Sequence, residues 1–458
     1  MLYTICNICG LRTNIACFGK TQTEINMEEK HMKKFFALVL AIVMVSLCIT
    51  GCGQTSTDGD QATGDKPVAY VLAEKGDTYS LGLASNFQTA FEKLGGEVIM
   101  ETFVKNTTNF SDYLQKAIDK KAAVIFAPNS TTVAANLLKN ANDVGITCPI
   151  MAGDTWEHSV ILDAVKGTDL DVYCSTFFDE SDTSSEAAGN FVTGFKKWLA
   201  DNPDKLQMNG GNDIVAAVSA LGFDAYNVAL SAIRAAAEEK GADMTSVDIA
   251  TALWKLNYKG GVTGDITFDK NGDAIKDCAY IKKAGDGKFE FVKTQTVAND
   301  ATQGTPATYT TDGVKLDTEG KKIVIGVFEP TSGDNAAGGK QEVIGAQYAN
   351  SLDNKVTIAG EEYTVELYVS DNGSVDEQAV TAASNIVNQH ALISLGSYGS
   401  GVSIAAADTF AAAGIPAIGV SCTNASVTEG HDFYFRTCFL DPFQGSVMAN
   451  FAWDTISK

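Results

Sequence analysis

The sequence predicts an α/β protein built from two doubly wound lobes, each with a parallel sheet, joined by a hinge. Three observations predict this class: β-rich runs alternate with amphipathic segments, the alternation occurs in two series, and a stretch without periodicity separates them. Strands that alternate with helices of this length are typical of parallel sheets with helices on both faces. With 458 residues, of which 45% are hydrophobic and 20% charged, the chain can form lobes with large cores.

The first series starts after Lys66. Residues 68–72 form a predicted strand, and apolar residues then recur at helical spacing from Leu83 to Leu94 before two glycines stop the helix. Strand and helix continue to alternate at residues 98–103, 110–120, 123–128, 131–142 and 148–152. The second series also starts with a strand and alternates at residues 323–328, 345–352, 363–368, 377–389, 391–395, 401–413 and 416–420. Residues 298–320, rich in Thr, Gly, Asp and Ala, form a predicted linker between the two series.

Charge and motifs narrow the function classes. The formal net charge of −22 repels nucleic acid and anionic lipid surfaces, so no nucleic-acid partner is expected. The sequence has no G-x-S-x-G elbow, no phosphate-binding loop and no dinucleotide fingerprint after a strand. His158, His390 and His431 lack metal-ligand spacing, and residues 269–273 fit a hairpin turn better than a calcium loop. We therefore expect no enzymatic site, no cofactor and no metal site.

Five of the ten cysteines lie in the predicted folded body: Cys148, Cys174, Cys278, Cys422 and Cys438. They are widely spaced and include no C-x-x-C pair. This pattern predicts neither a zinc site nor a disulfide framework. A bridge between Cys422 and Cys438 stays open for an oxidising location, and buried free thiols are the favoured interpretation.

A predicted export signal precedes the body. Residues 32–34 start a short basic region, and residues 35–47 are an uncharged apolar run of signal-peptide length. The sequence Ile-Thr-Gly-Cys that ends at Cys52 resembles the bacterial lipobox, which implies that Cys52 is acylated; an ordinary signal peptide with an incidental cysteine is the alternative. Residues 1–31 are then an upstream extension, residues 32–52 a signal peptide with lipobox, and residues 53–66 a flexible tether.

The segment from Lys321 carries the most specific pattern of the chain. Its stretches KKIVIGVFEPTSGDNAAGG, HALISLGSYGSGVSIAAADTFAAAGIPAIGVSCTNASVTEG and FYFRTCFLDPFQG closely resemble the first lobe of leucine/isoleucine/valine-type periplasmic binding proteins. From Lys66, KPVAYVLAEKGDTYSLGLASNF and AAVIFAPNSTTVAANLLKNANDVGITCPIMAGDTWE resemble the second lobe. The resemblance covers nearly all of residues 66–297 and 321–456. It implies the type I periplasmic-binding-protein fold, in which two hinged lobes close on a ligand.

The order of the two parts is inverted relative to that family. There, the part that ends in FRTCFLDPFQG leads into the part that begins KPVAYV, whereas here that strand stands at residue 67. This implies a circular permutation joined through the linker 298–320, which could span roughly 70 Å when extended. A recombined, non-functional product is the alternative. The resemblance assigns residues 67–211 and 258–297 to ligand-binding lobe 2, and residues 212–257 and 321–458 to ligand-binding lobe 1.

The resemblance also implies residues that would bind an amino acid. In lobe 1, Ser400 and Gly401 stand in a glycine-rich loop before a predicted helix and match the carboxylate-binding position; the N-cap of that helix is the alternative or additional role of Ser400. Ser421, Cys422 and Thr423 follow a predicted strand at its carboxyl end, where open α/β sheets bind ligands. Thr423 would contact both ends of the amino acid, and Ser421 would offer a backbone carbonyl.

In lobe 2, Asp154 matches the acid that pairs with the ligand ammonium, and Trp156 is either a pocket wall or a packed core residue. Two positions depart from the family. Ala337 stands where the family has a tyrosine, and Ser130 and Thr131 replace an aromatic pair. These departures imply a wider or more polar pocket than a leucine site, so the identity of the ligand stays open.

Together these features predict an extracytoplasmic, lipid-anchored solute-binding protein, expected to be a monomer, that captures an amino acid or close analogue by lobe closure. Its expected partners are this small-molecule ligand and an ABC permease in the membrane. A sensing ectodomain that reports its ligand to a receptor is the alternative function.

Overall fold

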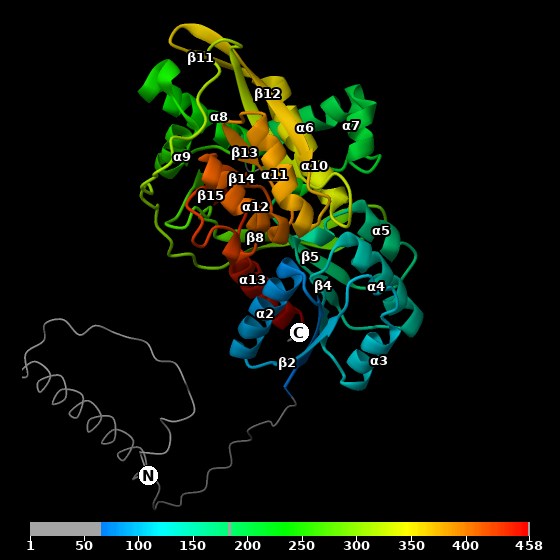
Figure 1. The fold of residues 1–458 in the computed structure, drawn as a ribbon. Helices are drawn as coiled ribbons and strands as arrows, with labels where there is room; N and C mark the ends of the chain where they lie inside the picture. Colours follow the sequence, from blue (N-terminus) through cyan, green and yellow to red (C-terminus); the bar gives the residue numbers. More distant parts are fainter. Residues whose placement is uncertain (1–65, 182–184, 457–458) are drawn as a thin grey trace, which may run out of the picture. The chain divides into compact units, whose positions relative to one another are not determined.

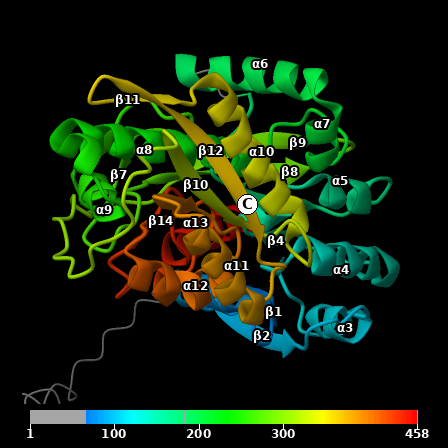
Figure 2. The same cartoon turned by 45° about the horizontal axis from the view of Figure 1, so that its top comes forward.

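The computed structural model describes residues 66–181 and 185–456. The predicted α/β class is confirmed: these residues form two large sheets with helices packed on them, in two lobes (Figure 1, Figure 2). We call the lobe that contains β1 lobe 2 and the other lobe 1. The predicted signal peptide, Cys52 and residues 53–65 of the predicted tether lie outside the described residues. Within the described part of the chain, no helix has the length and apolar character needed to cross a membrane.

Lobe 2 is built on a seven-stranded sheet in the order β2-β1-β3-β4-β5-β8-β9. The first five strands are parallel, while β8 is antiparallel to β5 and to β9. Its strands are β1 (Val68–Glu74), β2 (Glu97–Phe103), β3 (Val124–Phe126), β4 (Ile150–Ala152), β5 (Val172–Thr176), β8 (Cys278–Ala284) and β9 (Phe289–Thr296). Its helices are α2 (Thr78–Lys93), α3 (Ser111–Asp119), α4 (Thr131–Val144), α5 (Ser159–Val165) and α13 (Asp441–Ile456), with a short 3-10 turn at Asp154–Trp156.

Helices cover both faces of this sheet, and successive side chains of a strand point to opposite faces. Ala69, Val71 and Ala73 of β1 belong to the core that includes α2 and α13, whereas Tyr70 and Leu72 belong to the core under α3, α4 and α5. The continuous apolar run that predicted a strand at residues 68–72 is therefore the signature of a doubly covered central strand.

Lobe 1 has a six-stranded sheet in the order β11-β12-β10-β13-β14-β15, parallel except for the β11–β12 hairpin. Its strands are β10 (Lys322–Glu329), β11 (Lys355–Ile358), β12 (Glu361–Asp371), β13 (Ile393–Leu395), β14 (Ala417–Gly419) and β15 (Tyr434–Arg436), with a separate pair β6 (Asn257–Tyr258) and β7 (Ile266–Thr267). Its helices are α6 (Glu186–Asp201), α7 (Pro203–Met208), α8 (Ala217–Lys240), α9 (Ser246–Lys255), α10 (Ala336–Leu352), α11 (Asp376–Asn388) and α12 (Ser400–Ala413), with 3-10 turns at Gly241–Asp243 and Ala425–Val427.

One predicted helix starts much earlier than expected. The sequence predicted a helix from residue 345, whereas α10 begins at Ala336. The first half of α10 was not predicted as helix because it contains several glycines, and glycine is a poor helix former. They are needed where α10 crosses α8: a Cβ on Gly345 would stand 2.1 Å from the carbonyl oxygen of Ser219, and one on Gly222 of α8 would stand 2.4 Å from that of Glu342.

The lobe boundaries differ from the prediction in three places. Helices α6 and α7, predicted in lobe 2, lie next to α10 of lobe 1 (Figure 2), where Phe191 and Phe195 pack their rings against Tyr348. The segment 258–277, also predicted in lobe 2, packs on lobe 1 through Phe268 and Phe435. Helix α13, predicted in lobe 1, lies beside α2 in lobe 2. In each case the segment packs on the lobe that buries its apolar side chains. Sequence order alone does not reveal which sheet an amphipathic helix will pack against.

The chain passes between the lobes four times. It passes once between β5 and α6, once between β7 and β8, once through the linker 298–320 between β9 and β10, and once between β15 and α13. The linker packs on lobe 1: the Tyr309 ring contacts that of Phe433 at a tilt, its hydroxyl accepts a hydrogen bond from the indole of Trp254 at 2.7 Å, and Leu316 is buried. At the β5 passage, the Glu157 carboxylate of lobe 2 accepts a hydrogen bond from the Ala217 N–H that begins α8, and also binds buried Lys282.

Candidate functional site

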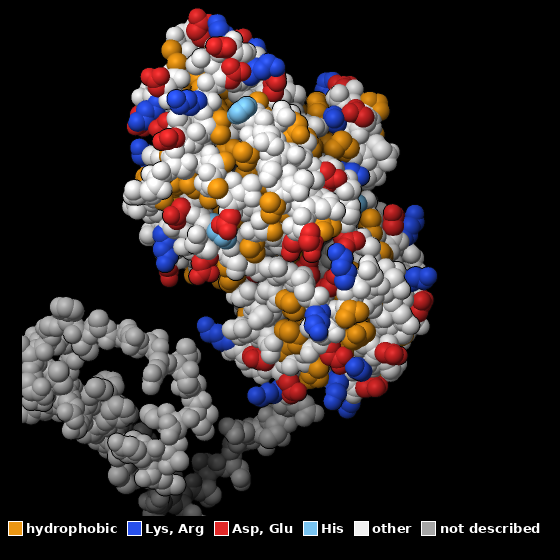
Figure 3. Space-filling model, viewed as in Figure 1, with side chains coloured by type: hydrophobic (Ala, Val, Ile, Leu, Met, Phe, Trp, Pro, Cys, Tyr) orange, Lys and Arg blue, Asp and Glu red, His pale blue; other side chains and the backbone are white. Residues whose placement is uncertain are grey.

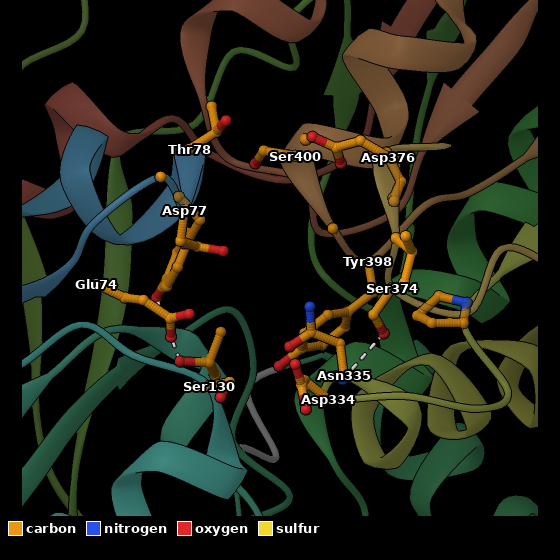
Figure 4. Close-up of a pocket in the computed structure, with 18 of the residues that line it drawn as sticks. Glu74, Asp77, Thr78, Ser130, Asp334, Asn335, Ser374, Asp376, Tyr398 and Ser400 are labelled. Carbon is orange, nitrogen blue, oxygen red and sulfur yellow. Dashed lines mark hydrogen bonds between the residues drawn. The ribbon is translucent and has the colours of Figure 1, made fainter. Parts of the chain in front are cut away.

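A cavity of about 340 Å³ lies between the two lobes. Figure 4 shows Glu74, Asp77 and Ser130 on its lobe 2 side, across from Asp334, Asn335 and Tyr398 of lobe 1. Most of its lining residues stand in the loops that follow parallel strands or in the first turns of the next helices, at the carboxyl edges of both sheets. This is the place where open α/β sheets bind ligands.

The structure brings five of the nine predicted ligand-binding residues to this cavity: Ser130, Asp154, Ser400, Gly401 and Ser421. The other four, Trp156, Ala337, Cys422 and Thr423, are not among its lining residues. Trp156, Cys422 and Thr423 are buried in the protein, and Ala337 lies in the first turn of α10. Cys422 and Cys438 are both buried free thiols, as the sequence favoured.

On the lobe 1 side, α12 points its first turn at the cavity. Gly399 is its N-cap, so the alternative N-cap role of Ser400 is wrong; Ser400 is the first residue of the helix. The Ser400 hydroxyl oxygen accepts a hydrogen bond from the Asn424 N–H at 3.2 Å. It thus ties the start of α12 to the loop that follows β14, while the unpaired N–H groups of the first turn stay available to an anionic group.

Arg436 holds the loop that follows β14. Its guanidinium is fully buried and donates to the carbonyl oxygens of Cys422 and Asn424, each at 2.7 Å, and to the Thr428 hydroxyl at 2.6 Å. Its Nε donates to Asp273 Oδ1 at 2.5 Å. Asp273 lies in the predicted hairpin turn 269–273, which is confirmed by the bridge between the residues that flank it.

Two buried carboxyl groups, those of Glu342 and Glu329, lie next to Ser421 on the lobe 1 side. The Ser421 hydroxyl donates to Glu342 Oε1, and Glu342 faces Glu329, whose Oε2 accepts the Tyr398 N–H at 2.8 Å. Burial raises the pKa of Glu342 to about 8, and burial together with the neighbouring Glu342 raises the pKa of Glu329 well above its ordinary value. Two adjacent carboxyls cannot both ionise there, so the pair holds a proton at neutral pH.

On the lobe 2 side, Asp154 is the most buried acid of the cavity, with 4% of its surface exposed. Its Oδ1 accepts hydrogen bonds from the Tyr79 hydroxyl at 3.1 Å and from Gln444 Nε2 at 2.8 Å. Burial raises the pKa of Asp154 to about 6, so it is an anion at neutral pH and lacks a cationic side-chain partner in the described protein.

The neighbouring residues have structural roles. Trp156 donates its indole N–H to the Asn129 carbonyl at 3.1 Å and packs in the core, which decides between the two interpretations left by the sequence. Ser130 is the N-cap of α4. Beside Ala337, an aromatic ring is supplied from elsewhere: Tyr398 lies so close to Gly338 that a Cβ there would stand 2.1 Å from its ring.

Several lining residues were missed by the sequence analysis, among them Glu74, Asp77, Tyr79, Asp376 and Tyr398. A signal for them did exist. Glu74 and Asp77 follow the predicted strand 68–72, and Asp376 precedes a predicted helix, so a systematic search of the loops after strands would have found them.

Contacts between the lobes surround the cavity. Asn424 Nδ2 donates to the Thr78 carbonyl at 3.2 Å, and Lys105 Nζ lies 3.4 Å from Asp334 Oδ2. The Thr132 hydroxyl also reaches the Asp334 carbonyl at 3.5 Å. No group of three or more His, Cys, Asp or Glu residues in the described ranges has the arrangement needed to hold a metal ion.

Comparison with known proteins identifies the family. The model of a family described as periplasmic binding protein matches residues 59–288 and 322–457, which is most of the chain. The chain belongs to the periplasmic binding protein family. The two lobes and the cavity between them are the architecture of such a periplasmic binding protein.

Individual relatives match over shorter stretches. An amino acid binding protein of Pseudomonas aeruginosa is 36% identical over 132 residues, which cover 28% of this chain and 35% of the relative. A Leu/Ile/Val-binding protein homolog of Brucella abortus is 33% identical over 134 residues, which cover 29% and 36%. The chain thus spans about a third of the length of the curated relatives it matches.

Solved structures are matched at low similarity. The leucine binding protein LivK of Thermotoga maritima has a TM-score of 0.43 and 26% identity, covering 50% of this chain and 60% of its own. An ABC transporter periplasmic solute binding protein of Actinobacillus succinogenes with bound D-allose has a TM-score of 0.43 and 12% identity, covering 86% of this chain and 92% of its own.

Proposed function

We propose that this periplasmic binding protein captures an amino acid or a close analogue outside the cytoplasm and delivers it to an ABC importer. The observation that carries the proposal is the pairing across the cavity of Asp154 with the first turn of α12. An unpaired carboxylate suits an ammonium group, and a helix N-terminus with Ser400 and Gly401 suits a carboxylate. A zwitterion that bridges both ends would stabilise the closed form through contacts that an open form cannot make.

The relatives support the same ligand class. One is named an amino acid binding protein and another a Leu/Ile/Val-binding protein homolog. Delivery to a permease and anchoring through lipidated Cys52 are parts of the proposal that rest on the family and on the lipobox pattern of the sequence.

We also propose that the chain is a circular permutation of the family order. Two contacts support it. Pro67, just before β1, accepts the Glu97 N–H at 2.9 Å, and Gly95 lies against Trp453 of α13, so the start of β1 and the end of α13 are close in lobe 2. The break would then lie within lobe 2, after the chain has passed from β15 to α13.

The deciding experiment is calorimetric titration of the purified chain with the common L-amino acids, alongside the Asp154→Ala variant. We expect one class of amino acids to bind the native chain and Asp154→Ala to lose most of that affinity. A cooperative melt without any amino-acid binding would contradict the proposal and favour a sensing role for another solute. Absence of a cooperative melt would favour the recombined, non-functional product.

A further inference from the structure

The cavity is strongly acidic. Six carboxylate residues and two lysines line it: Glu74, Asp77, Asp154, Asp334, Asp376 and Glu377 against Lys75 and Lys105. In Figure 3, acidic side chains gather on the viewed face where the two lobes meet. Such a site attracts cations and repels anions over several ångströms.

The acids occupy two levels of the cavity. Asp154 is buried deep inside, whereas Glu74, Asp77 and Asp334 are half-buried and Asp376 is exposed. In the proposed function, Asp154 receives the ligand's α-ammonium. Asp376 lies beside the start of α12, with its Oδ1 2.7 Å from where a Cβ on Gly401 would stand. Glu74 and Asp77 follow β1 on the lobe 2 side, where space is left for the ligand's side chain.

The outer acids are poorly neutralised by the protein. Lys105 pairs with Asp334, but Glu74, Asp77, Asp376 and Glu377 form no ion pair within the described ranges. Asp77 uses one oxygen to cap α2, accepting the Ser80 N–H at 2.6 Å. Burial, and then the neighbouring Asp77, raise the pKa of Glu74, while Lys105 lowers it.

A separate observation comes from Tyr398. Its side chain is 8% exposed and lines the cavity, and no hydrogen bond to its hydroxyl is found among the described residues. Burial, and then the neighbouring Asp154, raise the pKa of Tyr398 well above its ordinary value. The hydroxyl lines the cavity without a partner in the described ranges and can accept as well as donate a hydrogen bond, and an ammonium or guanidinium group is rich in donors for it.

Other ligand types fit less well. An apolar side chain would leave several carboxylates desolvated and unpaired when the lobes close, which is costly. An acidic side chain would add repulsion. A metal ion lacks a suitable group of ligands here.

We propose that the cavity selects an amino acid with a cationic side chain, which the outer acids Glu74 and Asp77 bind while Asp154 holds the α-ammonium. This specificity rests on the proposed function and deepens it.

Calorimetric titrations with L-lysine and with L-norleucine, a neutral analogue of similar length, test the proposal. We expect L-lysine to bind the native chain at least tenfold more tightly, with an affinity that falls as salt is added because screening weakens the attraction. The double variant Glu74→Gln/Asp77→Asn should lose at least tenfold in L-lysine affinity and less than threefold in L-norleucine affinity, because asparagine can still cap α2.

Asp408→Asn is the matched control, because Asp408 is an exposed acid on α12 that does not line the cavity. It should leave both affinities unchanged. Equal or tighter binding of L-norleucine or L-leucine to the native chain would overturn the proposal while the amino-acid-binding function stood. Binding of no amino acid at all would overturn both.

Discussion

Replacement of Arg436 by methionine tests how the loop after β14 is held. Arg436 and Asp273 are both almost fully buried, with side chains 0% and 5% exposed, and the guanidinium also binds three backbone carbonyls of residues 422–425. Methionine fills much of the same volume but supplies no charge and no donor. Removing one partner of a buried ion pair costs about 3–5 kcal/mol, because the remaining charge is left uncompensated. Each carbonyl that stays unsatisfied adds about 1 kcal/mol or more.

We therefore expect Arg436→Met to lower the free energy of unfolding by about 6–8 kcal/mol when all three carbonyls stay unsatisfied. Urea unfolding followed by circular dichroism measures it. Arg234→Met is the matched control: Arg234 binds Asp353 at 2.8 Å, but both side chains are nearly half exposed, 46% and 45%. Exposed pairs contribute about 0–1 kcal/mol, so this variant should be nearly neutral.

A double-mutant cycle separates charge from packing. Replacing Asp273 by asparagine in the Arg436→Met background removes the orphaned charge, and we expect it to recover about 2 kcal/mol. The reasoning is refuted if Arg436→Met costs no more than Arg234→Met. It is also refuted if the two changes at the pair are simply additive.

Three further predictions concern the core, the acid pair and the thiols. Phe87 is fully buried and stacked on two phenylalanine rings at 5.5 and 4.1 Å, so Phe87→Ala should cost about 3–5 kcal/mol in urea unfolding, whereas Phe291→Ala on the exposed edge strand should cost under about 1 kcal/mol. The pKa of Glu342 is raised from 4.5 to about 8, so between these pH values the folded chain holds a proton that the unfolded chain releases. The free energy of unfolding should therefore fall as pH rises from 4.5 to 8, and Glu342→Gln should flatten that fall. A steeper pH dependence in the variant would contradict the assignment. Burial raises the pKa of the Cys422 thiol to about 11, so iodoacetamide should label Cys422 and Cys438 only after unfolding; native labelling, or a peptide pair joined by a disulfide, would contradict their assignment as buried thiols.

The sequence was sufficient to predict many of the strands and helices, and to predict the edge of the sheet at which the cavity lies. Strands such as β1 and β12 and helices such as α4 and α12 lie within a few residues of their predicted positions, because period and capping residues are local properties. The loop containing Asp154 and the loop before Ser400 were found for the same reason, since each follows an apolar strand.

Long-range pairing could not be predicted. Arg436 and Asp273 are 163 residues apart, and neither sequence neighbourhood shows that its charge is buried. Glu329 and Glu342 stand at the end of a strand and inside a helix, where an acid is usually solvated. The lobe that α13 joins is decided by which apolar surface remains uncovered after the sheets form, and a periodic pattern carries no information about that partner.

The position of α13 has a practical consequence for biosensor design. Residue 68, which begins β1, and residue 456, which ends α13, both belong to lobe 2, so they move as one body when the lobes rotate. A donor and acceptor fluorophore placed at these two positions would keep a constant separation and report no ligand. A pair with one fluorophore at residue 68 or 456 and the other in the β11–β12 hairpin of lobe 1 would have one fluorophore on each lobe. Energy transfer between these two fluorophores would change when the lobes close.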